Sequence, residues 1–255
     1  MRIEDKVVVV TGGASGIGRA LVRVFAGHGK AKHVVVADLN GDGAEKVAQE
    51  IGGSSMRVDV GRESDIIELI NSTENNFGPI GLFCSNAGIA IGDGIDEPDD
   101  VWETIWRVNT MSHVWAARHL IPRMVARGGG YLCSTASAAG LLTQLEKAPY
   151  SVTKHAAVAL AEWLSITYHD AGIRFTVLCP QAVRTAMNPD GVGATSIDGM
   201  LEPEEVALAC LEAINEERFF ALPHGSVREY MRRKANNPDR WLNGMRRLRK
   251  SHVEN

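Results

Sequence analysis

Residues 11–18 read Thr11-Gly12-Gly13-Ala14-Ser15-Gly16-Ile17-Gly18, directly after a run of four valines at 7–10. The valine run is typical of a buried strand, and residues 16–28 have the pattern of an amphipathic helix. Glycines at such a turn let the chain bend tightly and let a pyrophosphate approach the backbone, while the helix N-terminus faces the phosphates. The pattern therefore predicts a dinucleotide site, with phosphate contacts at Gly12, Ser15, Gly16, Ile17 and Gly18.

A carboxylate follows the second predicted strand, residues 33–37. At this place Asp38 can accept hydrogen bonds from both adenosine ribose hydroxyls. It would also repel a 2′-phosphate, since two charges about 4 Å apart interact by about 4 kcal/mol at an effective dielectric near 20. Asp38 therefore favours NAD as the cofactor. The alternative is that Asp38 only caps the helix that follows the strand.

Short β-branched runs continue to alternate with longer amphipathic segments along the 255 residues, a length that suits one α/β domain. Further strands are predicted at 55–58, 80–84, 131–134, 173–178 and 218–222, and helices at 43–51, 64–75, 99–127, 150–169 and from about 202. Such alternation is typical of a parallel sheet covered on both faces. We predict one doubly wound Rossmann domain of the α/β class over residues 1–255, with a parallel sheet of about seven strands.

The composition excludes several classes of protein. A net charge of −4 supplies no global positive field for nucleic acid or anionic lipid. The four cysteines form no CxxC pair, so buried free thiols in a reducing cytosol are expected rather than disulfides or metal ligands. The N-terminus is too short and charged for a signal peptide, and the apolar stretch 156–161 is far below the ~18 residues of a membrane span. We expect a cytoplasmic protein without a metal.

Two segments stand outside the alternation. Residues 184–200 are rich in small and polar residues without a clear period, which predicts a lid loop at the strand ends. Residues 226–250 form a basic helical tail with nine Lys or Arg residues. The apolar positions of this tail keep roughly helical spacing, so docking on its own fold or on a sister subunit is favoured over binding to nucleic acid or membrane.

Further motifs follow the glycine-rich turn in a fixed order: Ser85-Asn86-Ala87-Gly88, then Asn109, then Ser137, then Tyr150-Ser151-Val152-Thr153-Lys154. Together they resemble the short-chain dehydrogenase/reductase family over residues 5–222. The resemblance implies an NAD-dependent oxidoreductase that acts on CH–OH groups, with a catalytic set of Asn109, Ser137, Tyr150 and Lys154. It also implies cofactor contacts at Asp59, Val60, Asn86, Ala87, Gly88, Tyr150, Lys154, Pro180, Val183 and Thr185, with Asp59 at the adenine and Asn86 steadying the central strands.

The chemistry of these residue types agrees with the resemblance. Tyr150 and Lys154 are four residues apart and share one face of a helix. A phenol has a pKa of about 10, and a neighbouring ammonium lowers that pKa by favouring the phenolate. Tyr150 could then take the alcohol proton in oxidation or return it in reduction. By resemblance, Ser137 bonds the substrate oxygen, Lys154 holds the nicotinamide ribose and Asn109 anchors a water.

One position departs from the family pattern, because Gln181 follows Pro180 where a glycine is common. The departure puts the local conformation and the contacts to the carboxamide in question. A non-catalytic sensor or scaffold that binds a dinucleotide is the alternative function, but loss of Tyr, Lys or Ser would have indicated it. Enoyl reductases of the same superfamily place the Tyr and Lys farther apart than they are here.

The loops expected around the nicotinamide are mostly apolar, which favours a secondary alcohol or ketone of low polarity over a sugar. Their apolar residues are Ile89, Ala90, Ile91, Ala139, Leu141, Leu142, Val183, Ala186, Met187, Val192 and Met200, and the polar candidates are Gln144, Arg184 and Asn188. The all-apolar stretch 156–161 and three tryptophans at 102, 106 and 115 predict an oligomer, and the family resemblance implies a homodimer or homotetramer. The sequence leaves open which of the two forms, and also the substrate and the physiological direction.

Overall fold

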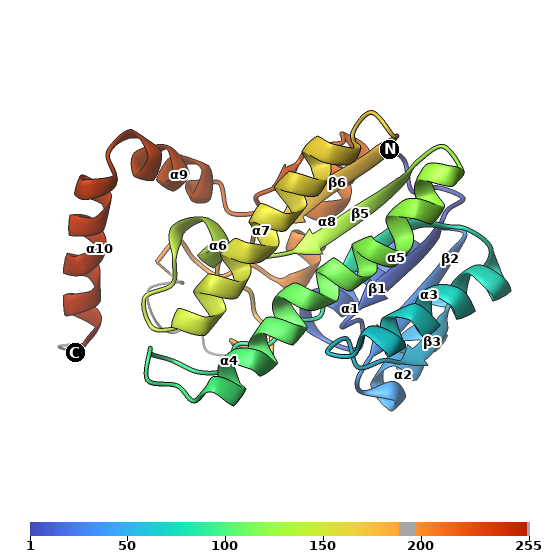
Figure 1. Ribbon diagram of the computed structural model, residues 1–255, viewed down its shortest axis with the longest axis horizontal. Helices are drawn as coiled ribbons and strands as arrows, with labels where there is room; N and C mark the ends of the chain where they lie inside the picture. The colour runs from blue at the N-terminus through green and yellow to red at the C-terminus, as the bar shows by residue number, and fades with distance from the viewer. Residues whose placement is uncertain (189–196, 254–255) are drawn as a thin grey trace.

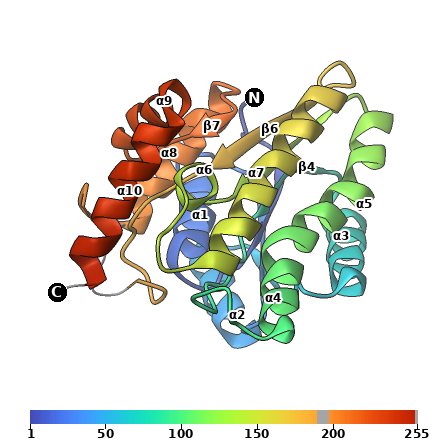
Figure 2. The ribbon, with the colours of Figure 1, turned by 60° about the vertical axis from the view of Figure 1, so that its left-hand side comes forward.

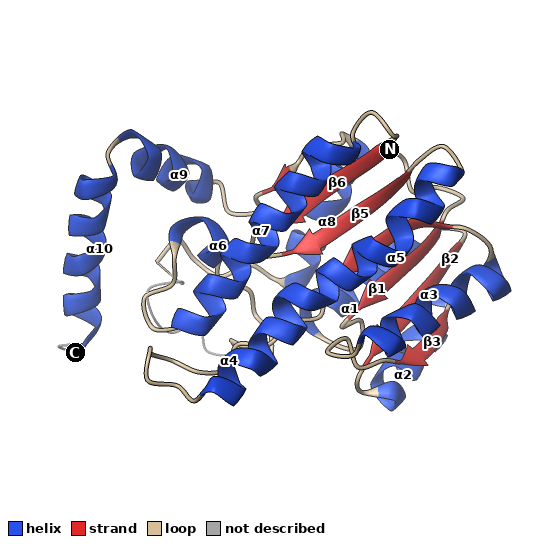
Figure 3. Ribbon diagram, in the orientation of Figure 1, coloured by secondary structure: helices blue, strands red, loops and turns tan. Residues whose placement is uncertain are grey.

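Seven parallel strands form a single sheet in the order β3-β2-β1-β4-β5-β6-β7 (Figure 3). The structure, a computed structural model, describes residues 1–188 and 197–253. The strands are β1 Val7–Thr11, β2 His33–Asp38, β3 Ser54–Arg57, β4 Ile80–Ser85, β5 Gly130–Thr135, β6 Ile173–Leu178 and β7 Phe220–Ala221. The predicted α/β fold with a parallel sheet of about seven strands is confirmed.

Helices cover both faces of the sheet (Figure 1). One face carries α1 Gly16–Ala26, α2 Gly41–Ile51 and α8 Pro203–Asn215, and the other carries α3 Glu63–Phe77, α4 Asp99–Trp106, α5 Ser112–Ala126 and α7 Ala148–Tyr168. The valines of β1 show why the run is continuous. Val8 and Val10 pack on the first face and Val9 on the second, because neighbouring side chains in a strand point to opposite faces.

The long helix predicted over residues 99–127 is interrupted. A π-helical turn, η1 Arg107–Met111, separates α4 from α5 and carries Asn109. Single π turns inside helices are common at functional sites. The spacing of apolar residues could not predict this turn. A single π turn changes the hydrogen-bond pattern of the backbone locally, while the same side of the helix stays buried.

The basic tail is two helices rather than one. Helix α9 Ser226–Asn236 ends before Pro238, and α10 Pro238–Val253 begins there. Asn237 is extended, with φ −152°, as the steric demand of the following proline favours. Val227 of α9 is buried next to α6 Ala139–Leu142, a short helix that the sequence did not predict. Helix α10 packs on α9 and stands at the edge of the molecule (Figures 1 and 2).

Four cysteines, Cys84, Cys133, Cys179 and Cys210, are buried and free, as predicted. Within the described residues, no helix combines the length and apolarity that crossing a bilayer requires. The predicted lid loop is described only at its two ends, since residues 189–196 lie outside the described part of the chain. The two ends are joined where the Arg184 amide donates to the Leu201 carbonyl oxygen at 3.0 Å.

Candidate active site

A cavity of about 1510 Å³ lies at the carboxyl ends of the strands. It runs from the glycine-rich turn after β1, past the ends of β4, β5 and β6, to helix α10. The strand order reverses between β1 and β4, and open α/β sheets bind their ligands at such a reversal. The fold therefore places the cavity where a ligand site is expected.

The glycines of the turn leave no room for side chains. Gly12 has φ +67°, and a Cβ on it would lie 2.8 Å from the Ala87 Cα. A Cβ on Gly18 would lie 1.9 Å from the Gly12 carbonyl oxygen. Both glycines are therefore required for the close packing of the turn. Because they also line the cavity at the N-terminus of α1 without side chains, their backbone forms a cradle that fits the pyrophosphate of a dinucleotide.

Asp38 ends β2 at the wall of the cavity, where its carboxylate accepts from two backbone amides. Its Oδ2 accepts from the Ala14 N–H at 3.0 Å and its Oδ1 from the Asn40 N–H at 2.9 Å. The N-cap of α2 is Asn40, whose side chain accepts from the Gly43 N–H at 3.0 Å. The alternative that Asp38 caps the helix is therefore wrong.

Asn86 links three strands behind the cavity. Its Nδ2 donates to the Thr11 carbonyl oxygen at 3.0 Å, and its Oδ1 accepts from the Thr135 hydroxyl at 3.0 Å. The ends of β1, β4 and β5 are thereby held together. Every residue that the sequence assigned to the cofactor lies on the wall of this cavity: Gly12, Ser15, Gly16, Ile17, Gly18, Asp38, Asp59, Val60, Asn86, Ala87, Gly88, Tyr150, Lys154, Pro180, Val183 and Thr185.

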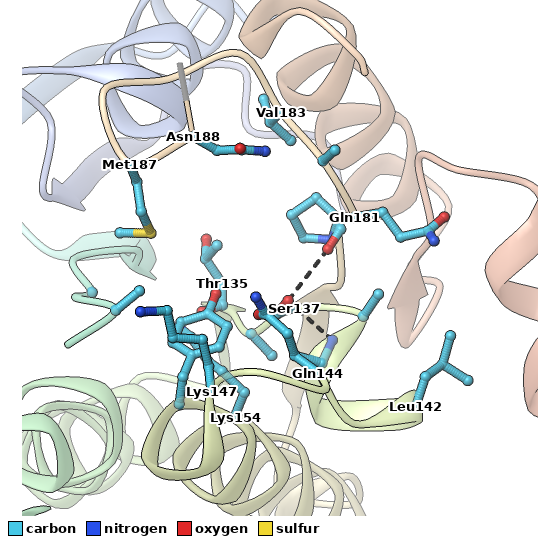
Figure 4. A pocket seen from close by; sticks show the side chains of 18 of the residues that line it. Thr135, Ser137, Leu142, Gln144, Lys147, Lys154, Gln181, Val183, Met187 and Asn188 are labelled. Atoms are coloured by element: carbon cyan, nitrogen blue, oxygen red, sulfur yellow. Dashed lines mark hydrogen bonds between the residues drawn. The ribbon is translucent and has the colours of Figure 1, made fainter. Parts of the chain in front are cut away.

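Three of the four predicted catalytic residues meet in the middle of the cavity: Ser137, Tyr150 and Lys154. Lys154 is only 3% exposed, and its Nζ donates to the Thr135 carbonyl oxygen at 2.9 Å. The Ser137 hydroxyl donates to the Pro180 carbonyl oxygen at 3.4 Å and accepts from the Ala139 N–H at 3.0 Å (Figure 4). These bonds hold the Ser137 side chain at the junction of β5, α6 and the segment after β6.

Asn109, the fourth, is fully buried behind the wall rather than on it. Its Oδ1 accepts from the Ile89 N–H at 2.9 Å, and its Nδ2 donates to the Ile89 carbonyl oxygen at 2.8 Å. The side chain thus binds the backbone that follows Gly88. A Cβ on Gly88 would lie 3.2 Å from the Lys154 Nζ, so this backbone passes close to the buried ammonium.

Burial sets the protonation of the central pair. It raises the pKa of Tyr150 above its usual value, against a lowering by the hydrogen bond between Tyr150 and Ser137. Burial also lowers the pKa of Lys154 to about 8. The prediction that the Lys154 ammonium lowers the Tyr150 pKa is wrong. Desolvation of the phenolate is the largest effect on this pKa and raises it, and the Lys154 Nζ donates its hydrogen bond to Thr135.

Gln181, which departs from the family pattern, joins three parts of the chain. Its Nε2 donates to Asp198 Oδ2 at 3.0 Å, and its Oε1 accepts from the Ser226 hydroxyl at 3.1 Å. Asp198 Oδ1 also accepts from the Tyr230 hydroxyl at 3.0 Å. The Gln181 backbone N–H donates to His224 Nδ1 at 3.2 Å. A glutamine here connects the end of β6, the end of the lid segment and α9, which a glycine could not do.

The substrate half of the cavity agrees with part of the predicted lining. Seven predicted apolar residues lie on the wall: Ile89, Ala90, Ala139, Leu142, Val183, Ala186 and Met187. The prediction is wrong for Ile91, Leu141 and Met200, which lie off the wall, and Val192 is outside the described residues. Gln144 and Asn188 are on the wall (Figure 4). Arg184 instead donates from Nε to Glu202 Oε1 at 2.7 Å.

Helices α9 and α10 supply a part of the wall that sequence reasoning missed. The residues are Tyr230, Arg233, Asn236, Asn237, Arg240, Trp241, Gly244, Met245, Arg247 and Leu248. A signal was present in the sequence, because the arginines at 240 and 247 are two helical turns apart. The basic composition of the whole tail hides this signal, because it favours a solvated surface helix.

Comparison with known proteins agrees with this geometry. The family model described as short chain dehydrogenase matches residues 6–192. The 1-deoxy-11-beta-hydroxypentalenate dehydrogenase of Streptomyces exfoliatus is 32% identical over 246 residues, which cover 91% of this chain and 88% of that protein. The 3beta-hydroxysteroid dehydrogenase 2 of Eggerthella lenta is 32% identical over 217 residues, which cover 81% of this chain and 78% of that protein. A short-chain dehydrogenase/reductase from Burkholderia phymatum, solved in complex with NAD, has a TM-score of 0.83 at 25% identity and covers 94% of this chain and 96% of its own.

Proposed function

The chain belongs to the short-chain dehydrogenase family, and on that premise we propose that it transfers a hydride between NAD(H) and a secondary alcohol or ketone carried on an apolar body. One observation carries the proposal. Ser137, Tyr150 and Lys154 meet in a cavity whose other end is the bare glycine turn with the Asp38 carboxylate. A hydride-transferring cofactor and an acid/base are thus both accommodated by one cavity.

The residues of the cofactor half fit a nicotinamide dinucleotide. Gly12 and Gly18 leave the cradle that a pyrophosphate needs, and Asp38 supports NAD through its negative charge at the ribose position. The related structure that was solved with NAD also supports this choice. Lys154 and Thr185 would hold the nicotinamide end. Bound there, the nicotinamide ring supplies the hydride for reduction or accepts it in oxidation.

Tyr150 would act as the acid/base. Its raised pKa keeps the phenol protonated at neutral pH, so it can donate a proton to a ketone oxygen during reduction. In oxidation Tyr150 would have to act as the phenolate, which its burial disfavours. The charge of Lys154, 5.6 Å from the ring centroid, would offset part of that cost without reversing the raised pKa. Ser137 would hold the substrate oxygen by a hydrogen bond, and Asn109 would fix the backbone beside Lys154.

The apolar part of the wall supports a substrate of low polarity. Leu142, Val183, Ala186 and Met187 are among its lining residues, and each CH₂ that a ligand buries there is worth about 0.8 kcal/mol. Two relatives are named as dehydrogenases of a hydroxypentalenate and of a 3beta-hydroxysteroid. These names support an apolar hydroxylated substrate for this chain as well.

The test is a panel of cyclic and acyclic secondary alcohols of rising hydrophobicity, with sugars and polyols beside them, assayed with NAD and NADP in parallel. We expect NAD-dependent turnover whose kcat/KM rises with apolar size. Faster turnover of a polyol would contradict the substrate class, and preference for NADP would contradict the cofactor. Binding of NADH without turnover of any alcohol or ketone would instead support the sensor or scaffold alternative.

We also propose a homodimer or homotetramer. Trp106 at the end of α4 and Trp163 and Ile166 on α7 are 41%, 58% and 75% exposed, although they are large and apolar. Neighbouring helices with such faces favour pairing with a second copy. The four free buried thiols support a location in the reducing cytoplasm.

A further inference from the structure

Helix α10 places two arginines on the wall of the cavity, beyond the apolar part. Arg240 and Arg247 are seven residues apart and therefore lie on one face of the helix. The same face presents Trp241, Met245 and Leu248 to the cavity, each partly buried. Charged and apolar groups thus alternate along one wall, which suits a ligand that is apolar in its body and charged at its end.

These two arginines differ from the other cations on the wall. In the described part of the chain, no hydrogen bond or ion pair engages the guanidinium of Arg240 or Arg247. Arg233 donates from its Nε to Glu229 Oε1 at 3.0 Å and lies over the Tyr230 ring, with 5.7 Å between the guanidinium carbon and the ring centroid. Lys147 is paired with Asp93, and Lys154 with the Thr135 carbonyl oxygen.

The acids on the described wall do not neutralise this pair either. Asp38 and Asp59 are at the end of the cavity assigned to the adenosine, remote in sequence and structure from α10. Asp198 accepts hydrogen bonds from the neutral Gln181 and Tyr230 side chains, so it keeps its single negative charge, which can balance only one of the two arginines. The α10 end of the cavity therefore carries a net positive charge that the described protein groups do not balance there.

We propose that Arg240 and Arg247 bind an anionic group, a carboxylate or a phosphate, at the end of the substrate remote from its alcohol or ketone. The proposal rests on the proposed function and narrows its substrate class. A guanidinium binds either anion through two parallel N–H···O bonds, a geometry that a single ammonium cannot supply. The apolar residues between Ser137 and α10 cover the body of such a substrate, and the arginines fix which end enters.

Binding can be measured without turnover, by titrating the full-length protein with decanoate, decyl phosphate and 1-decanol in a calorimeter. We expect decanoate or decyl phosphate to bind at least about tenfold more tightly than decanol, since only the anions form charge-assisted hydrogen bonds with the guanidinium groups. The tighter of the two anions identifies the preferred group. Equal affinity for decanol and for both anions would overturn the proposal.

A matched pair of double variants locates the contact. Arg240→Gln with Arg247→Gln removes two charges from the wall, and Arg246→Gln with Arg249→Gln removes two charges from α10 that do not line the cavity. We expect the first pair to lose the preference for anions and the second to keep it. Equal loss in both would mean a general charge effect. If the Arg240→Gln, Arg247→Gln variant sediments as a smaller species than the wild type, the two arginines belong to a subunit contact. Equal loss in both variants, or this change of size, would overturn the proposal.

Turnover separates this proposal from the one on which it rests. With NAD, 9-hydroxydecanoate should have at least about tenfold higher kcat/KM than its methyl ester, and Arg240→Gln with Arg247→Gln should remove that preference. Oxidation of the acid and the ester at equal rates would overturn the anion site alone. If neither compound nor any alcohol is oxidised while decanoate still binds through the two arginines, the proposed function fails and the anion site stands.

Discussion

The Nζ of Lys154 lies 5.6 Å from the centroid of the Tyr150 ring and makes no hydrogen bond to its hydroxyl. The two side chains share one face of α7, and Lys154 is almost completely buried. The hydrogen bond of Lys154 goes to Thr135 instead, so an effect of its charge on the tyrosine acts only through space and is outweighed by the burial that raises the Tyr150 pKa. Because the two side chains are not hydrogen-bonded to each other, Tyr150 can be tested for its role in proton transfer and Lys154 for the cost of burying its charge.

Removal of the Tyr150 hydroxyl tests the acid/base role. Tyr150→Phe should lower kcat by about 10²–10⁴, the range for loss of a general acid/base, while the affinity for NADH changes little. Stopped-flow kinetics and NADH fluorescence measure the two quantities. Tyr168→Phe, at the end of the same helix, is the matched control and should keep wild-type kcat. Wild-type turnover by Tyr150→Phe would remove this residue from the mechanism.

Lys154→Met should stabilise the protein at neutral pH while abolishing turnover. The pKa of Lys154 is lowered from 10.5 to about 8 in the folded state, which corresponds to roughly 3 kcal/mol at 1.36 kcal/mol per unit. Loss of the bond to Thr135 offsets part of this, so we expect a gain of about 1–3 kcal/mol in the free energy of unfolding at pH 7.

The pH dependence of that gain has a definite sign. Below pH 8 both the folded and the unfolded lysine are charged, so the folded protein bears the full cost of burying the ammonium. The cost disappears as the pH rises from about 8 to 10.5, because the folded lysine is then neutral and the unfolded lysine loses its proton as well. Urea unfolding of Lys154→Met and wild type across this range measures the effect, with half-buried Lys147→Met as control. A gain that persists unchanged at pH 10.5 would contradict a desolvation cost at Lys154.

Asp38→Asn should weaken the preference for NAD over NADP. The change removes the charge that would repel a 2′-phosphate and keeps the size of the side chain, so the ratio of kcat/KM values should fall by roughly 10- to 100-fold. Initial rates with both cofactors give the ratio. Asp42→Asn in the first turn of α2, off the cavity wall, should leave the ratio unchanged. An unchanged ratio in Asp38→Asn would show that another group selects the cofactor.

Loss of the Gln181 amide should loosen α9. Gln181→Gly and Gln181→Met both remove the bonds to Asp198 and Ser226, and each net hydrogen bond is worth about 0.5–1.5 kcal/mol. Hydrogen exchange should become faster in α9 in both variants, and the substrate KM should rise more than kcat falls. If only the glycine variant shows the effect, backbone freedom rather than the two bonds is responsible.

Charge on the exposed apolar face of α7 should dissociate the proposed oligomer. We expect sedimentation of the wild type at micromolar concentration to give a species larger than 27.6 kDa. Trp163→Asp with Ile166→Asp should give the monomer, because two charges cannot be buried in a subunit contact. Leu242→Asp, an equally drastic change on exposed α10, is the control. A monomeric wild type would contradict the assembly.

The fold was predictable because its central strands are buried on both faces. Such strands read as continuous β-branched runs, and β1 and β2 stand out at 7–10 and 33–37 without any help from the rest of the chain. The π turn at Asn109 and the break at Asn237 were harder. The first is hidden inside an intact apolar pattern, and the second depends on one proline in a segment whose dominant feature is its charge.

All the residues that the sequence assigned to the cofactor lie on the cavity wall, whereas the part of the wall on α9 and α10 was not predicted. The position of the glycines directly after the first strand, together with Asp38 after the second, predicted a phosphate cradle, and Gly12 and Gly18 lie on the wall. The contribution of α9 and α10 depends on where the chain goes after β7, which no local pattern determines. Gln181 is similar, because its partner Asp198 is brought to it only by the folded lid segment.

Helix α10 packs mainly on α9, while the sheet and its two helical layers form the core without it. Apart from Trp241, which packs against the cluster of Ala138, Leu142 and Val227, substitutions on its cavity face therefore alter the shape and charge of the wall without creating voids in the core. Selection for a new substrate could act on this helix while the folding of the domain stays intact. The same separation makes α10 a replaceable module: exchanging it for the corresponding helix of a relative is a direct route to redirecting selectivity in a protein engineering experiment.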